Sequence, residues 1–240
     1  MRTWLARLQT AAMLLHARSH LLPWAMATCG IAAMLSAHGQ WFTAYAVLKP
    51  LTMVLALVWV WQWADRSRHL TATRWLLAGL LCSMVGDVCL LTERGFLPGL
   101  VAFLLAHVCY ILLFRRDRPW QRHAWVVPAS GIGLLAAAMY LYLFHHGLPG
   151  TMRAPVALYV LVIAAMAVQS VARAITLRTG AAWCVAAGAI SFMVSDSILA
   201  FNRFVAPVPA SSLWVLGTYY LAQWLIVHGM LQTMQTASRK

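Results

Sequence analysis

Eight apolar stretches follow one another along the chain, with only short polar segments between them. They lie at about residues 21–38, 42–61, 74–91, 97–114, 124–144, 153–171, 181–201 and 211–231. A helix needs about 20 mostly apolar residues to cross the hydrocarbon core of a membrane. Hydrophobic residues make up 62% of the 240 residues, more than a soluble domain of this size could bury. The sequence therefore predicts an all-α, polytopic integral membrane protein with eight transmembrane helices.

Positive charge lies almost entirely on one side of this predicted bundle. With a cytoplasmic N-terminus, 14 of the 18 Lys and Arg residues fall in cytoplasmic segments, 3 fall in outer loops, and Lys49 lies within a span. Cytoplasmic loops of membrane proteins are enriched in Lys and Arg. We therefore predict a bacterial inner membrane type of protein with both termini in the cytoplasm. This placement accounts for the formal net charge of +13 without a nucleic-acid partner.

The chain divides into three predicted segments. Residues 1–20 alternate Arg and His with large apolar residues, a pattern typical of a basic amphipathic segment at a membrane surface. Residues 21–231 form the eight-helix transmembrane domain, and residues 232–240 form a short basic tail. All five cysteines lie inside apolar stretches without a Cys-x-x-Cys pair, which favours small apolar packing residues over disulfides or zinc ligands.

Two aspartates lie inside predicted spans and have similar neighbours. Residues 79–91 read GLLCSMVGDVCLL and residues 188–200 read GAISFMVSDSILA, so Asp87 and Asp196 occupy the same position. A charged side chain at the centre of a membrane costs at least about 2.5–3.5 kcal/mol on insertion scales. The whole chain has only 5 acidic residues. We therefore expect the two aspartates to form one polar site in the outer half of the bundle.

The similarity continues beyond the aspartates at the same offset of 109 residues. The matched pairs are Arg94 with Arg203, Pro98 with Pro207, and Tyr110 with Tyr219. An offset of four helices preserves the direction of each helix, so the pattern favours two parallel four-helix repeats. Chance similarity between apolar helices is the alternative interpretation.

Lys49 is predicted to lie at a depth similar to that of Asp87 and Asp196. A buried ammonium group needs a partner, and a carboxylate is the least costly one. Two carboxyl groups and one lysine leave one acid without a cation, and this acid can stay protonated beside an ionised neighbour. Such a pair is suited to general acid–base hydrolysis. The alternative is an ion pair that only fixes the packing of the helices.

Other polar side chains within the spans are candidates for contact with a substrate. Together with Lys49 they are His107, Tyr110, Asn202, Tyr219, Tyr220 and Gln223. No His-x-x-x-His or Glu-x-x-His motif groups possible metal ligands, and no Walker loop or Gly-x-Ser-x-Gly motif is present. The sequence thus predicts no metal site and no cofactor.

Several short motifs occur in a characteristic order along residues 42–230. They read KPL at 49–51, GDV at 86–88, AH at 106–107, SDS at 195–197 and YYLAQ at 219–223. In order and spacing they resemble the YhhN-like lysoplasmalogenase family. The resemblance implies an eight-helix membrane enzyme that hydrolyses the vinyl ether bond of a lysoplasmalogen, releasing a fatty aldehyde and a glycerophospho-alcohol. It also implies that Asp87 and Asp196 are the catalytic pair, that a lysophospholipid in the membrane is the substrate, and that no metal is required.

Vinyl ether hydrolysis fits two carboxyl groups in different protonation states. A general acid protonates the alkenyl carbon distal to oxygen, water then adds with the help of a base, and the hemiacetal collapses. One alternative is a small transporter or proton-coupled carrier, since membrane-embedded Asp and Lys also form proton relays. Another is a metal-dependent membrane lipid amidase or esterase, which would need three converging ligands. The identity of the acid and the oligomeric state stay open at this point.

Overall fold

The computed structural model describes residues 21–64, 66–116 and 122–238, and within these ranges the chain is helical. The helices are α2 (Leu22–His38), α3 (Phe42–Trp63), α4 (Arg66–Cys89), the 3-10 turn η1 (Glu93–Gly95), α5 (Phe96–Phe114), α6 (Arg122–His146), α7 (Gly150–Leu177), α8 (Gly180–Phe204) and α9 (Ser211–Ser238). Each long helix coincides with one predicted apolar stretch, and no described residue lies in a strand. The predicted all-α class is confirmed.

Six of the described helices are long and apolar enough to cross a membrane. These are α3, α4 from His69 onward, α5 with η1, α6 from Trp125 onward, α7 and α8. α2 has only 17 residues, and neither α2 nor α9 belongs to this group. The chain is therefore a polytopic helical membrane protein.

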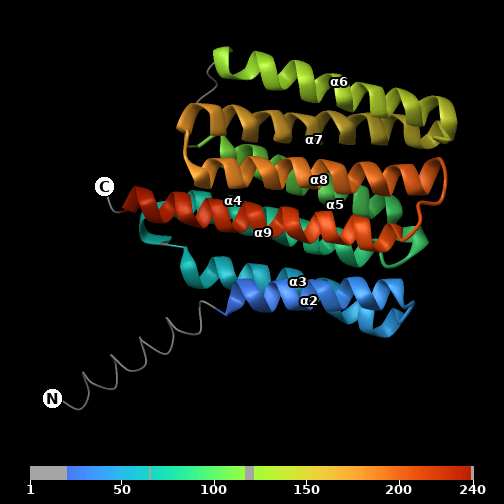
Figure 1. Ribbon diagram of the computed structural model, residues 1–240, viewed down its shortest axis with the longest axis horizontal. Helices are drawn as coiled ribbons and strands as arrows, with labels where there is room; N and C mark the ends of the chain where they lie inside the picture. Colours follow the sequence, from blue (N-terminus) through green and yellow to red (C-terminus); the bar gives the residue numbers. More distant parts are fainter. Residues whose placement is uncertain (1–20, 65, 117–121, 239–240) are drawn as a thin grey trace.

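The contacts between helices form a closed ring of six helices with two helices outside it. Figure 1 shows α6 at one edge of the bundle and α2 with α3 at the opposite edge. Within the ring, each of α3, α4, α5, α7, α8 and α9 contacts the next, and α9 returns to α3. α2 packs against α3 and α9, while α6 packs against α7 and α8. The start of α2 and the end of α9 lie at the same end of the bundle. The two outside helices are the first members of the predicted halves, an arrangement that agrees with the repeat, which stays a prediction.

Glycines allow close approach between neighbouring helices near the two aspartates. A Cβ atom at Gly86 would lie 2.6 Å from the ring of Phe103, and one at Gly79 would lie 2.5 Å from the ring of Tyr110. The ring of Phe103 on α5 therefore packs against Gly86, the residue before Asp87. On α8, a Cβ atom at Gly188 would lie 2.9 Å from the carbonyl oxygen of Ala222 on α9. Small residues thus hold α4 against α5 and α8 against α9.

Two helices continue more than one helical turn beyond their predicted ends. α7 extends to Leu177 rather than 171, and α9 extends to Ser238 rather than 231. Arg173, one of the basic residues counted among the cytoplasmic segments, lies within α7, where its side chain is buried and donates from Nη2 to Thr233 Oγ1 at 3.3 Å. Strong helix formers such as Ala172 and Ala174 surround Arg173 and favour continuation of the helix. The predicted segment 1–20 and the last two residues lie outside the described residues.

Candidate active site

Asp87 forms a buried ion pair and a hydrogen bond, and the three residues involved lie on three helices. It lies on α4 with 1% of its surface exposed. Lys49 Nζ on α3 lies 3.5 Å from Asp87 Oδ1, and the Tyr219 hydroxyl on α9 donates to Asp87 Oδ2 at 2.7 Å. Lys49 is itself 4% exposed and lies 5.4 Å from the centre of the Tyr45 ring. Lys49 therefore has a carboxylate partner, as its predicted depth within the membrane led us to expect.

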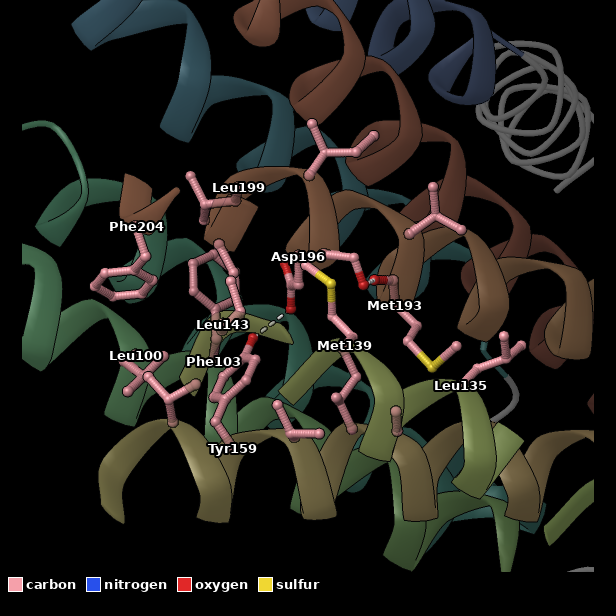
Figure 2. A pocket seen from close by; sticks show the side chains of 18 of the residues that line it. Leu100, Phe103, Leu135, Met139, Leu143, Tyr159, Met193, Asp196, Leu199 and Phe204 are labelled. Atoms are coloured by element: carbon pink, nitrogen blue, oxygen red, sulfur yellow. Dashed lines mark hydrogen bonds between the residues drawn. The ribbon is translucent and has the colours of Figure 1, made fainter. Parts of the chain in front are cut away.

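Asp196 has different partners, none of which is a Lys or Arg within the part of the chain that the structure describes. It lies on α8, and its Oδ2 accepts a hydrogen bond from the Tyr159 hydroxyl on α7 (Figure 2). His107 Nε2 on α5 lies 2.9 Å from the Tyr159 oxygen and 3.5 Å from Asp196 Oδ2. The His107 ring is fully buried and packs edge-on against Phe192 at 4.7 Å. Asp196 thus ends a chain of hydrogen bonds that begins in the core.

Two cavities meet at Asp196. A polar cavity of about 390 Å³ is lined by both aspartates together with Lys49 and Tyr219. An apolar cavity of about 350 Å³ is lined by Asp196 and Tyr159 and otherwise mainly by aliphatic, Met and Phe side chains of α5, α6, α7 and α8. Asp196 belongs to the walls of both cavities, whereas Asp87 belongs only to the polar one.

The apolar cavity runs along the bundle from the end at which α6 and α8 terminate toward its middle. Leu143 and Phe204, near the C-terminal ends of α6 and α8, line one part of it, and Leu135 and Met193 line the deeper part (Figure 2). At 1.5 Å per residue, positions 135 and 143 of α6 lie about 12 Å apart along the helix. Asp196 lies between these two parts. The cavity therefore has the shape of a slot for a hydrocarbon chain, with one carboxyl group in its side.

The mouth of the polar cavity carries one charge of each sign. Arg203 Nη1 lies 3.6 Å from Glu93 Oε1, and the Arg203 guanidinium lies 5.3 Å from the centre of the Phe96 ring. Asn202 also lines this cavity, but its Oδ1 accepts from the Val208 N–H at 2.9 Å and so fastens the turn between α8 and α9.

The structure distributes the predicted substrate-binding residues over three places. Lys49, Asn202 and Tyr219 line the polar cavity, and His107 contacts Asp196. Tyr110 and Gln223 lie in the core, where the tyrosine hydroxyl donates to Gln223 Oε1 at 2.7 Å. Tyr220 lines a separate apolar groove between α2 and α9, where its ring lies 3.1 Å from the position of a Cβ atom at Gly30.

Sequence reasoning did not single out Tyr159, the hydrogen-bond partner of Asp196. A tyrosine in an apolar span is common, and the neighbours of Tyr159 in the sequence carry no motif. The repeat offset of 109 residues could have drawn attention to Tyr159, because it aligns position 159 with Pro50, the residue after Lys49. The two aspartates therefore receive partners from corresponding helices, a lysine from α3 and a tyrosine from α7.

Among the described residues, no group of three His, Cys, Asp or Glu side chains is arranged to hold a metal ion. All five cysteines are free.

Comparison with known proteins identifies relatives that match most of the chain. The model of the YhhN family matches residues 44–230. Lysoplasmalogenase TMEM86B of Homo sapiens is 33% identical over 194 residues, which are 81% of this chain and 77% of that protein. A lysoplasmalogenase of Mycobacterium tuberculosis is 30% identical over 203 residues, 80% of this chain and 73% of that protein. No solved structure matches the chain.

Proposed function

This chain belongs to the YhhN family, and from that membership we propose that it is a lysoplasmalogenase. It is an enzyme of the hydrolase class, and its relatives in mammals and mycobacteria carry the name of this activity. In the proposed reaction, the vinyl ether bond of a lysoplasmalogen is hydrolysed to a fatty aldehyde and a glycerophospho-alcohol. The observation that carries the proposal is the position of Asp196, where an apolar cavity meets a polar one.

The two cavities match the two parts of a lysolipid. Its single hydrocarbon chain fits the apolar slot of about 350 Å³, and its glycerophosphate headgroup fits the polar cavity of about 390 Å³. The vinyl ether bond joins these two parts in the substrate, so it lies beside Asp196 when both cavities are occupied. Arg203 at the mouth offers a guanidinium group to the phosphate.

The proposed chemistry is acid–base catalysis by Asp87 and Asp196. One carboxyl group protonates the alkenyl carbon, which leaves positive charge on the carbon and oxygen of the former vinyl ether. The other, ionised carboxylate stabilises this charge in a site of low polarity and accepts a proton from the attacking water. Neither step requires a strong nucleophile, in agreement with a site that consists of carboxyl groups, phenols, one lysine and one histidine.

Aldehyde release is the direct test of this function. Purified protein in detergent should release a fatty aldehyde from lysoplasmenylethanolamine. It should release none from the matched alkyl ether lysolipid, which lacks the double bond and cannot be protonated at carbon. Absence of aldehyde from the vinyl ether substrate under conditions in which the protein remains folded would exclude the proposed activity.

Chain-length preference should follow the deep part of the apolar slot. Replacing Leu135 with Trp adds volume to that wall, so we expect the KM for long-chain substrates to rise several-fold while the KM for short chains changes little. The matched control is Leu134→Trp, because Leu134 is 72% exposed and does not line the slot. Equal effects of Leu135→Trp on long and short chains would show that the hydrocarbon chain lies elsewhere.

We also propose that all eight long helices cross the membrane, with both ends of the chain in the cytoplasm. Support comes from the antiparallel bundle, in which α2 starts and α9 ends on the same side (Figure 1). Gly150 and Gly180 begin α7 and α8, and a Cβ atom at either position meets nothing within 4 Å. A membrane-impermeant thiol reagent should label Gly150→Cys in intact cells, but Gly180→Cys only after the membrane is opened. The reverse pattern would place both termini outside.

A further inference from the structure

Asp87 and Asp196 are equivalent in sequence, but they lie in opposite electrostatic surroundings. Building on the proposed function, we propose that Asp196 is the protonated carboxyl group that donates the proton to the alkenyl carbon, while Asp87 remains ionised beside Lys49. Three observations carry this assignment: the cation at Asp87, the neutral hydrogen-bond chain at Asp196, and the position of each carboxyl group relative to the two cavities.

The cation beside Asp87 holds this carboxyl group in its ionised form. Lys49 and Asp87 are both almost fully buried, and their charged atoms lie 3.5 Å apart. Within the described residues, Lys49 forms its ion pair with no other carboxylate. In the resting state, with Asp196 protonated, a neutral Asp87 would leave the buried ammonium group without a nearby counter-charge, which is strongly unfavourable. The Tyr219 hydroxyl donates to Asp87 as the Tyr159 hydroxyl donates to Asp196, so the difference between the two carboxyl groups lies in the lysine.

The hydrogen bonds at Asp196 indicate neutral partners. Tyr159 has one hydroxyl proton and gives it to Asp196, so its oxygen must accept the proton of His107 Nε2. His107 Nδ1 is buried and has no hydrogen-bond partner among the described residues. A second proton on that nitrogen would have no acceptor, which favours the neutral imidazole. The hydrogen-bond partners of Asp196 are therefore uncharged, and the charged groups that share its polar cavity are paired with each other, Lys49 with Asp87 and Arg203 with Glu93. Within a membrane, ionisation of a carboxyl group without a cation of its own is costly.

The geometry at Asp196 leaves one oxygen available to a substrate. Oδ2 accepts from Tyr159, whereas Oδ1 makes no hydrogen bond to any described residue. The Asp196 side chain is 15% exposed and the Asp87 side chain 2%, so Asp196 is the more open of the two. Asp196 also lines the apolar slot, so its carboxyl group lies beside the position proposed for the alkenyl carbon.

The assignment gives a balanced proton cycle. The π electrons of the double bond form a C–H bond with the proton of Asp196, which becomes a carboxylate. Water adds its oxygen to the positively charged carbon and gives a proton to Asp87. In the collapse of the hemiacetal, the hydroxyl proton returns to Asp196. The C–O bonding electrons stay on the glycerol oxygen, which takes the proton from Asp87. One water molecule is consumed, and both carboxyl groups return to their starting states.

Infrared spectroscopy can read these protonation states directly, because a protonated carboxyl group has a carbonyl stretch separate from that of a carboxylate. The chain contains only four aspartates, so labelling with [4-13C]aspartate identifies an aspartate band by its shift. In wild-type protein at neutral pH, in a detergent without ester groups, we expect one such band. It should disappear in Asp196→Asn and persist in Asp87→Asn.

Two conservative variants provide a matched pair that does not depend on removing a carboxyl group. Tyr159→Phe removes the hydrogen bond to Asp196, and Tyr219→Phe removes the one to Asp87. We expect the band to shift to higher frequency in Tyr159→Phe and to stay unchanged in Tyr219→Phe. A missing band in the wild type, or one that responds only to the Asp87 and Tyr219 variants, would overturn the assignment. The aldehyde assay of the same preparation tests the proposed function separately, because the band does not depend on turnover.

Discussion

Asp196→Asn is expected to lower the rate of aldehyde release by about 10²–10⁴-fold, the usual contribution of a positioned general acid or base. Asn keeps the volume of the side chain, and its amide oxygen can still accept from Tyr159, but it has no acidic proton to give to the alkenyl carbon. The loss should lie mainly in kcat, because the cavities that bind the substrate keep their walls. Steady-state kinetics with lysoplasmenylethanolamine would measure it.

Asp87→Asn should cause a loss of similar size by removing the stabilising charge and the acceptor for the proton of water. The control is Asp117→Asn, the same chemical change in a segment predicted from sequence to be a cytoplasmic loop, and it should retain wild-type kinetics. More than about a tenth of wild-type activity in Asp196→Asn or Asp87→Asn would be incompatible with the range for an essential proton-transfer group. The corresponding aspartate would then have only a structural role.

Lys49→Met is expected to destabilise the protein by about 3–5 kcal/mol, the typical cost of removing one partner of a buried ion pair. Met has nearly the length of the lysine stem, so packing between α3 and α4 is largely kept while Asp87 loses its cation. Thermal unfolding in detergent, followed by circular dichroism, would show a lower midpoint.

The double variant Lys49→Met/Asp87→Asn separates charge from packing. It removes both charges, so it should regain most of the stability lost in Lys49→Met while remaining inactive. A double variant as unstable as the single one would mean that the ammonium group stabilises the fold through contacts other than the ion pair. The comparison is a double-mutant cycle at two residues in direct contact, where such coupling is expected.

The helices could be predicted from the sequence because each apolar stretch of spanning length leaves the chain few alternatives in a membrane. The ends of the helices were harder to predict, as α7 and α9 show. Arg173 and the polar residues after 231 suggested loops, yet a long basic side chain can be buried within a helix when it finds a polar partner such as Thr233. A hydropathy scale includes the free-energy cost of burying a basic side chain, but it does not include the polar partner that lowers this cost.

The carboxyl groups and Lys49 could be found in the sequence because charges are rare in spans and their depths agree. Tyr159 could not, since its role depends on α5 contacting α7 directly with α6 outside the ring. That arrangement brings together Tyr159 and His107, which are 52 residues apart in sequence. The same dependence on three-dimensional packing explains why Tyr110 and Gln223 face each other rather than a cavity.

The junction of the two cavities at Asp196 also bears on how the products would leave. Cleavage at this point would divide an amphiphile into an aldehyde that lies in the apolar slot and a water-soluble alcohol that lies in the polar cavity. The slot is bounded by α6, which packs outside the ring, so in a membrane it would lie next to the bilayer. The polar cavity is lined by Glu93 and Arg203 at the end of the bundle where α8 terminates. Each product would then have its own exit into the phase in which it dissolves, and the reaction would sort its products as it forms them.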